Sequence, residues 1–518
     1  MRFINSKKSK PEDLKPSEIV QQVLSTNLQE NLDKLKFLVQ GCSDVVIKDF
    51  KFGHNPTVRG IIVYFDGLVD KSIIELNLLK PLMLEMDMSN QQIDFKERDI
   101  IATLQEKILS IAELKTLDNL QELCHHISSG DTVLLVDGYA LGLVASTRSW
   151  QGRPIQTPEN EVVIFGPKEG FCETLRFNTA LLRRRIKSTN FKIESMVIGR
   201  ITKTDVVLCY IDQLAPPELI KEVKARLEKI DIDGVLDTSY LIEFIADDRN
   251  TMFTQAMHTE KPDRVCGNLL EGRLCIMVDG SPMALILPIS FPQYWTSSED
   301  YSVHYVPASL FRILRFMAFW VALLLPSIYV AIITYHHEMI PTPLLLTIAA
   351  TRQGVPFPAF IEALVMDVTF ELLREAGLRL PRAVGPAVSI VGALIIGDAA
   401  VKAGLVSTPM VVIIAFTGIA SFVSPSYNAA IIIRIARFGF LIIAGVLGFL
   451  GIMVGLVLMI TRMASLSSFG LPYLSPLAPF NLKQITDVLV RRPWFNDQER
   501  PYLEGMQNQV RQGDNHEK

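Results

Sequence analysis

Ionisable residues interrupt the most apolar part of this chain. Asp398, Lys402, Arg434 and Arg437 stand beside uncharged stretches of 31 residues (403–433) and 23 residues (438–460). A helix needs about 20 apolar residues to cross a bilayer, so these stretches predict membrane-spanning helices. Ionisable groups inside a membrane are costly, and they usually face protein or water and serve a function. We therefore take these four residues as candidate intramembrane polar groups.

A second set of carboxylates precedes them. Glu362, Asp367 and Glu371 recur at spacings of five and four residues, which is typical of the polar face of an amphipathic helix over 357–373. Such a helix lies at the membrane surface, or its acidic face lines a water-filled space. Asp398 and Lys402 stand one helical turn apart and can pair. Two interpretations of this pair carry equal weight: a bridge near the headgroups, or a pair facing a pore or cavity.

Glycines recur in the last long apolar stretch. Gly445, Gly448, Gly451 and Gly455 follow one another at spacings of three, three and four residues. Small residues at such spacings let two membrane helices approach closely. The pattern predicts helix packing, within the chain or between copies of it.

The polar half of the chain carries no recognisable catalytic motif. Residues 1–300 lack a phosphate-binding GxxxxGK[ST] loop, a GxGxxG turn and an HExxH pair, so we expect no catalytic residue, no metal, no cofactor and no enzymatic activity. The six cysteines form no CxxC pair, which favours reduced thiols in the cytoplasm. Arg183, Arg184 and Arg185 are interpreted as solvated helix positions. With a net charge of −4 and no sustained basic face, a nucleic-acid partner is not expected.

Hydropathy divides the chain into two unlike halves. We predict a fold of the α+β/membrane class, in which a cytoplasmic half of two similar α/β subdomains precedes an α-helical multi-pass membrane domain. The expected parts are a disordered N-terminus (1–16), α/β subdomains at 17–160 and 161–290, an interfacial linker (291–315), a membrane domain of four to six segments (316–482) and a flexible cytoplasmic tail (483–518).

A repeat underlies the two subdomains. A helix expected at 17–40 and strands at 44–50 and 60–65 precede the hairpin 132–145, whose Asp137-Gly138 pair predicts a type I′ turn. Asp137-Gly138 matches Asp279-Gly280 at an offset of 142 residues, and Asp66 matches Asp212 at an offset of 146. This predicts a duplicated unit, although two common hairpin motifs would give the same signal.

Charge around the first apolar stretch predicts its orientation. Phe316–Tyr335 is uncharged and follows Arg312 and Arg315, so its start is expected in the cytoplasm, and no signal-peptide pattern opens the sequence. Further along, 409–424 predicts a span, whereas 463–482 favours a re-entrant or surface-lying segment. The number of crossings stays open.

Four stretches of the chain resemble a known family. CSDVVIKDF, PQYWTSSEDYS, IGDAAVKAGLVSTPMVVIIAFTGIASFVSP and LGFLGIMVGLVLMITRMASLSSFGLPYLSPLAP are similar to the A subunits of GerA-type spore germinant receptors of endospore-forming bacteria. The likeness implies a subunit in the inner spore membrane that works with a transporter-like B subunit and a lipoprotein C subunit. It also implies self-association through the membrane domain into a nutrient-gated ion channel.

Two other functions remain open at this stage. An auxiliary spore-membrane channel of the same family would share every one of these patterns. A secondary transporter would also have broken helices and buried charges, but it would predict two related membrane halves.

Overall fold

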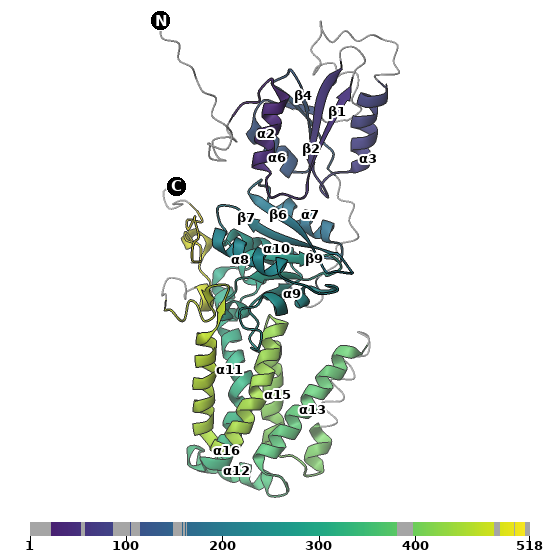
Figure 1. Cartoon of the computed structure of the whole chain (residues 1–518). Helices are drawn as coiled ribbons and strands as arrows, with labels where there is room; N and C mark the ends of the chain where they lie inside the picture. The colour runs from purple at the N-terminus through teal and green to yellow at the C-terminus, as the bar shows by residue number, and fades with distance from the viewer. Residues whose placement is uncertain are drawn as a thin grey trace.

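The computed structural model describes residues 22–52, 57–85, 114–148, 163–380, 397–480 and 487–512, together with Leu104, Pro158 and Glu161 and without Tyr502. Two α/β units and a helical half follow one another along one long axis (Figure 1). The expected disordered N-terminus, most of the helices expected at 100–111 and the stretch 384–396 lie outside the described residues.

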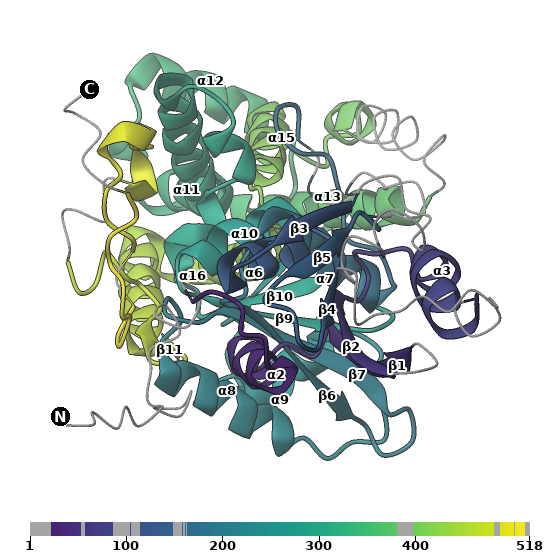
Figure 2. The same cartoon turned by 90° about the horizontal axis from the view of Figure 1, so that it is seen from above.

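The first α/β unit is a five-stranded antiparallel sheet with helices on both faces. Its strands are β1 (Val45–Phe52), β2 (Val58–Phe65), β3 (Leu114–Leu117), β4 (Thr132–Val136) and β5 (Gly142–Ala145), in the order β1-β2-β4-β5-β3. Helices α2 (Leu28–Leu38) and α6 (Leu120–Ser128) cover one face, and α3 (Lys71–Ile73), η2 (Ile74–Leu79) and η3 (Pro81–Glu85) cover the other (Figures 1 and 2). The predicted first helix begins only at Leu28, where the Asn27 side chain caps it.

The second unit repeats this sheet. Strands β6 (Phe191–Ile198), β7 (Thr204–Ile211), β8 (Met257–Thr259), β9 (Leu274–Val278) and β10 (Ala284–Leu287) are ordered β6-β7-β9-β10-β8 and are again antiparallel. Its helices are α7 (Leu175–Arg185), α8 (Pro217–Glu228), α9 (Thr238–Ile245) and α10 (Pro262–Leu270). One apolar cluster joins the sheet to α8 and α9, and another joins it to α7 and α10.

Equivalent hydrogen bonds confirm the predicted repeat. The Asp137 carboxylate accepts from the amide of Leu28 at 3.1 Å, and the Asp279 carboxylate accepts from the amide of Leu175 at 3.0 Å. Each aspartate thus links its hairpin to the start of the first helix of its unit. The expected type I′ turn is wrong, because only the glycine of the Asp137-Gly138 pair has a positive φ and the loop continues to Gly142.

A buried ion pair joins the two units. The Arg183 guanidinium on α7 donates to both carboxylate oxygens of Asp44, each at 2.9 Å, and stacks near the rings of Phe65 and Phe191. Arg183 is 1% exposed, so its interpretation as a solvated position is wrong. The three arginines share the end of one helix, but helical periodicity turns only Arg183 toward the first unit.

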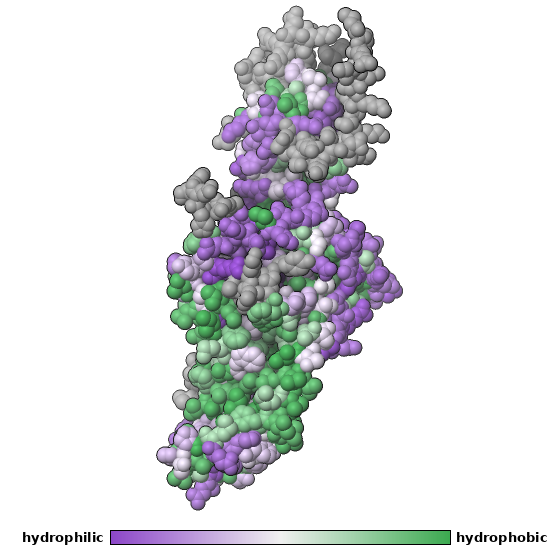
Figure 3. Space-filling view, turned by 90° about the vertical axis from the view of Figure 1, so that its left-hand side faces the viewer, coloured by the Kyte–Doolittle hydropathy of each residue, from purple (hydrophilic) through white to green (hydrophobic). Residues whose placement is uncertain are grey.

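The helical half contains α11 (Tyr305–Tyr335), α12 (Thr342–Arg352), α13 (Ala359–Arg379), α15 (Thr408–Phe422) and α16 (Tyr427–Ser465). By length and composition, α11 and α16 are candidate membrane spans, and α15 is a shorter apolar helix. The visible face of this half is mostly apolar, with hydrophilic residues at its far end and on the α/β units (Figure 3).

Helix α16 reverses direction at Gly448. This residue has φ 60° and ψ −140°, outside the helical region. A Cβ built on Gly455 would lie 2.8 Å from the Phe440 ring, although a straight helix would separate these residues by about 22 Å. Both ends also reach the second α/β unit, through Asn428 with His258 and Arg462 with Asp248. The helix is therefore two antiparallel arms, and the interpretation of the four glycines as one stripe on one helix is wrong.

The second α/β unit shares a core with the helical half. Phe291 packs edge-on against Trp295 and Phe319 of α11, and its ring lies 5.9 Å from that of Tyr473. The segment expected to re-enter or lie on the membrane instead forms the small strands β11 (Ser467–Ser468) and β12 (Leu471–Pro472) against this unit. Its polar backbone is satisfied there, since the Phe291 amide donates to the Tyr473 carbonyl.

The C-terminal tail also packs on the second unit. Asp487 bonds to Arg312, and Arg511 pairs with Glu271 at 3.0 Å. A short helix, η8 (Trp494–Asn496), lies between these contacts. Both ends of the helical half therefore return to the same α/β unit.

Candidate functional site: an ion-pair network between membrane-type helices

Arg437 is the centre of a buried ion-pair network. It lies in the first arm of α16 and is 0% exposed. Its guanidinium pairs with Asp367 of α13 at 2.7 Å and 2.9 Å, and with Glu371, one turn further along α13, at 2.9 Å. The four-residue spacing of the two acids puts both on the face of α13 that meets α16.

Glu371 receives two further arginines. Arg374 lies 2.6 Å from it on the same helix, and Arg434 lies 3.4 Å from it on α16. The five residues comprise two acids and three arginines, so the formal charge of the network is +1 (3 − 2). Burying one of these charges alone would cost several kcal/mol, and mutual pairing offsets that cost.

Glu362 belongs to a second buried group at the start of α13. It is 1% exposed and pairs with Arg352 of α12 at 3.0 Å. Its other oxygen accepts from the amide and the hydroxyl of Ser407, at 3.0 Å and 2.8 Å. This carboxylate therefore connects α12, α13 and the residue that caps α15.

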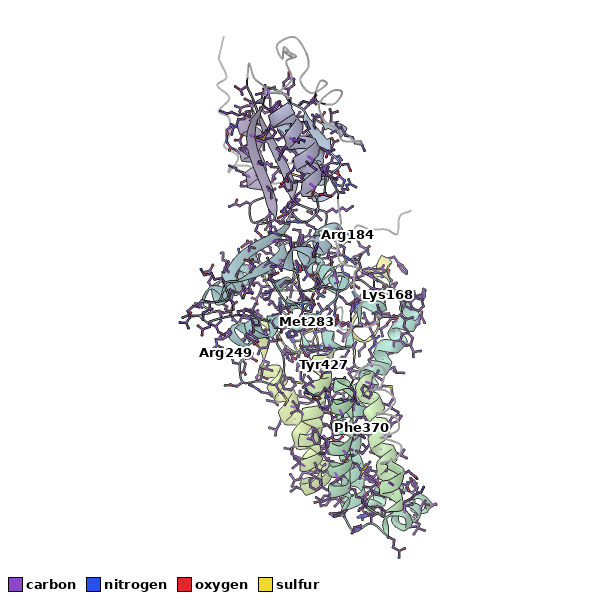
Figure 4. All side chains as sticks on the ribbon, turned by 90° about the vertical axis from the view of Figure 1, so that its right-hand side faces the viewer. Lys168, Arg184, Arg249, Met283, Phe370 and Tyr427 are labelled. Carbon is purple, nitrogen blue, oxygen red and sulfur yellow. The ribbon has the colours of Figure 1, made fainter. Side chains whose placement is uncertain are left out.

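Glycines allow α13 to approach its neighbours. A Cβ on Gly418 of α15 would lie 2.3 Å from the ring of Phe370, and one on Gly445 of α16 would lie 2.6 Å from the ring of Phe360. Figure 4 labels Phe370 within the helical half. Because both rings occupy the space of absent side chains, α13 comes close enough for its acids to reach Arg437.

The other glycines of the predicted set serve the reversal of α16. Gly448 forms the turn itself, against the ring of Tyr335, whose hydroxyl donates to the carbonyls of Gly445 and Val446 at 2.9 Å. Gly451 and Gly455 lie against the first arm, where a Cβ would approach Ile443 and Phe440. The contacts are between helices of one chain.

Asp398 and Lys402 stand apart from this network. Their side chains pair with each other at 2.6 Å, and 58% and 74% of them are exposed. The nearby Gly404 approaches the carbonyl of Gly354, which follows α12 at the far end of the helical half. The bridge common to both interpretations is present, at the end distant from the α/β units.

Five of the seven predicted polar residues thus come together, as two buried groups. The acidic face of 357–373 is not a surface in the single chain, because it packs against α15 and α16. Sequence analysis missed Arg352 and Ser407 as partners of Glu362, since both are distant in sequence and only the packing of three helices joins them.

A polar contact also links the second unit to α16. Burial lowers the pKa of His258 on β8, and its Nδ1 lies 3.0 Å from the Asn428 side-chain nitrogen. With that amide nitrogen as donor, Nδ1 must be the neutral acceptor. Figure 4 shows the neighbouring Tyr427 where the second unit meets the helices.

Two α/β units joined to apolar helices that enclose ion pairs define a protein built partly for water and partly for an apolar surrounding. The chain belongs to the family described as Bacillus/Clostridium GerA spore germination protein, which matches residues 33–503. This confirms the resemblance found in the sequence.

Individual relatives extend over almost the whole chain. An uncharacterized membrane protein, YfkQ, of Bacillus subtilis (strain 168) is 45% identical over 92% of this chain and 91% of its own length. Spore germination protein KA of the same organism is 44% identical over 95% and 89%. The crystal structure of the N-terminal domain of the A subunit of the Bacillus megaterium spore germinant receptor GerK3 covers 52% of this chain and 99% of its own, with 36% identity and a TM-score of 0.42.

Proposed function

We propose that this chain is a membrane subunit of a nutrient germinant receptor that triggers spore germination. Several copies would form an ion channel that opens when nutrient binds, and no chemical turnover takes place. Membership of the GerA family supports the receptor role, because relatives at 44% and 35% identity are named spore germination proteins.

The buried ion-pair network is the observation that supports a channel-forming membrane part. Charges are tolerated among apolar helices when protein groups receive them, as Asp367 and Glu371 receive Arg437. Since the network is internally satisfied and holds α13 to α16, it serves as the frame of the helical half. Ions would then move between copies rather than through the network.

Asp398 and Lys402 are the residues we assign to the mouth of that path. They are the members of the predicted set that stay exposed in the single chain, at the end of the helical half distant from the α/β units. A paired charge at that position meets headgroups or water. In an assembly of several copies it would face the entrance of a shared pore.

The proposed orientation places the α/β units on the cytoplasmic, spore-core side of the inner spore membrane. Arg312 and Arg315 stand at the α/β end of α11, as the positive-inside rule requires. Helices α11, α13 and α15 and the two arms of α16 would be the membrane segments. The partners are a transporter-like B subunit, a lipoprotein C subunit, further copies of this chain and the lipid bilayer.

Ion flux in liposomes tests the proposal. The chain is reconstituted with the B and C subunits encoded beside it, and flux is measured with and without nutrient. We expect nutrient-dependent flux that does not saturate at carrier-like rates. Flux coupled to nutrient uptake would instead indicate a transporter, and no flux with intact assembly would leave only a scaffold. Nutrient-independent flux would favour the auxiliary channel.

A matched pair of double variants tests the assigned mouth. Asp398→Asn with Lys402→Gln removes one exposed i,i+4 ion pair without changing net charge. Glu375→Gln with Arg379→Gln does the same to the exposed pair on α13. We expect the first variant to alter conductance or ion selectivity and the second to leave both unchanged. Equal effects would remove Asp398 and Lys402 from the ion path.

A further inference from the structure

A cleft of about 720 Å³ lies where the second α/β unit, the linker before α11 and the C-terminal tail meet. Arg273, directly before β9, lines it together with Glu271 from the end of α10. The tail contributes Trp494 and Arg511 to the opposite wall. Clefts of this size hold small organic molecules rather than only water.

Arg273 is the unusual residue of this cleft. Its side chain is 4% exposed, yet Nε and Nη1 have no hydrogen-bond partner. Its one ion-pair contact is from Nη2 to Glu271, at 3.6 Å, which is beyond ordinary hydrogen-bond distance. An unpaired edge of two parallel N–H donors is the geometry that binds two oxygens of one carboxylate or phosphate.

Neighbouring charges leave that edge unneutralised. Glu271 is shared, because Arg511 from the tail pairs with it at 3.0 Å. Arg264, also at the cleft, is satisfied by Glu161 at 2.5 Å and by the Thr296 carbonyl at 3.1 Å. Burial lowers the pKa of Arg273, Glu271 opposes this effect and Arg264 adds to it. A bound anion would offset the cost of burying this guanidinium.

We propose that this cleft binds a small organic anion through a carboxylate or phosphate group held by Nε and Nη1 of Arg273. The rest of the ligand lies between α10 and the tail, against Leu270 and Trp494. Because residues of the tail form one wall, a bound ligand ties the tail to the second α/β unit. The site is separate from the ion path and does not depend on the channel being correct.

Two stability variants distinguish a ligand site from a structural arginine. Replacing Arg273 by Met keeps the side-chain length and removes an incompletely paired charge, so the ligand-free chain in detergent should keep or raise its Tm. Arg264→Met is the matched control, since it removes a satisfied buried arginine and should lower Tm by several degrees. An equal loss of Tm in both variants would show that Arg273 is structural and would overturn the proposal.

Binding is measured by calorimetry on the purified full chain with benzoate and phenyl phosphate as probes. Benzyl alcohol, which carries the same ring without an anion, is the negative control. We expect one probe to bind at sub-millimolar concentration, at least tenfold more weakly to Arg273→Gln, and equally to Arg249→Gln, a change at an exposed arginine outside the cleft. The better probe identifies the group as carboxylate or phosphate. No binding of either anion below 10 mM, or equal binding to Arg273→Gln, overturns the proposal.

Discussion

Neutralising Asp367 should destabilise the helical half. Asp367 is 1% exposed, and its only ion-pair partner among the described residues is Arg437, which is 0% exposed. Asp367→Asn raises the formal charge of the five-residue network from +1 to +2. Removing one member of a buried pair costs about 3–5 kcal/mol. Glu371 still pairs with Arg437 at 2.9 Å, so we expect about 3 kcal/mol, the lower end of that range.

The assay is the thermal stability of the purified chain in detergent, followed by size-exclusion chromatography. About 3 kcal/mol corresponds to a Tm lower by roughly 6–12 °C for a part of this size. Glu375→Gln on the same helix is the matched control, because its partner Arg379 is exposed and such surface pairs contribute about 0–1 kcal/mol. Asp367→Leu combined with Arg437→Met removes the whole pair and should recover most of the lost stability.

Two results would refute this reasoning. If Asp367→Asn matches Glu375→Gln in Tm, the carboxylate is solvated in the assembled protein. If that variant also changes conductance, the acidic face lines the aqueous path after all. If the Leu/Met double variant is no more stable than the single variant, the loss does not come from an unpaired buried charge.

Three further predictions address the turn, the junction and the orientation. Gly448→Leu should cost about 2–3 kcal/mol, because φ 60° with ψ −140° is strained for any other residue, whereas Gly439→Leu, in open space on the same arm, should be tolerated; comparable Tm values would contradict the reversal. Burial lowers the pKa of His258, so the folded state binds fewer protons than the unfolded state, and stability should fall as pH drops below about 6.5. A Tm series from pH 7.5 to 5 should be flatter for His258→Gln, and parallel series would exclude this residue. An impermeant thiol reagent should label Glu228→Cys, exposed on α8, only after cell lysis, with the native chain setting the background; labelling of intact cells would invert the orientation.

Local patterns predicted the elements and the repeat because their causes lie within a few residues. Alternating apolar residues and the Asp-Gly pairs located β4, β5, β9 and β10, and the offset of 142 residues between the two pairs indicated a unit that the structure shows twice. The turn type was wrong because a positive φ at Gly138 alone already closes the loop, a choice made by the strands it joins. The helix expected to start at residue 17 begins at Leu28 because a side-chain cap outweighs apolar spacing.

The sequence by itself determined that this chain is half water-soluble and half apolar, that its α/β unit is repeated and that ionisable residues stand among apolar helices. Composition and periodicity decide these properties, because burial free energy follows the apolar surface of each segment. Only the tertiary structure decided what those ionisable residues do. Arg437 meets Asp367 because Gly448 turns α16 back and Gly418 and Gly445 admit the aromatic rings of α13. Such pairings join residues about 70 positions apart, and their energy depends on distance and burial, which no local pattern contains.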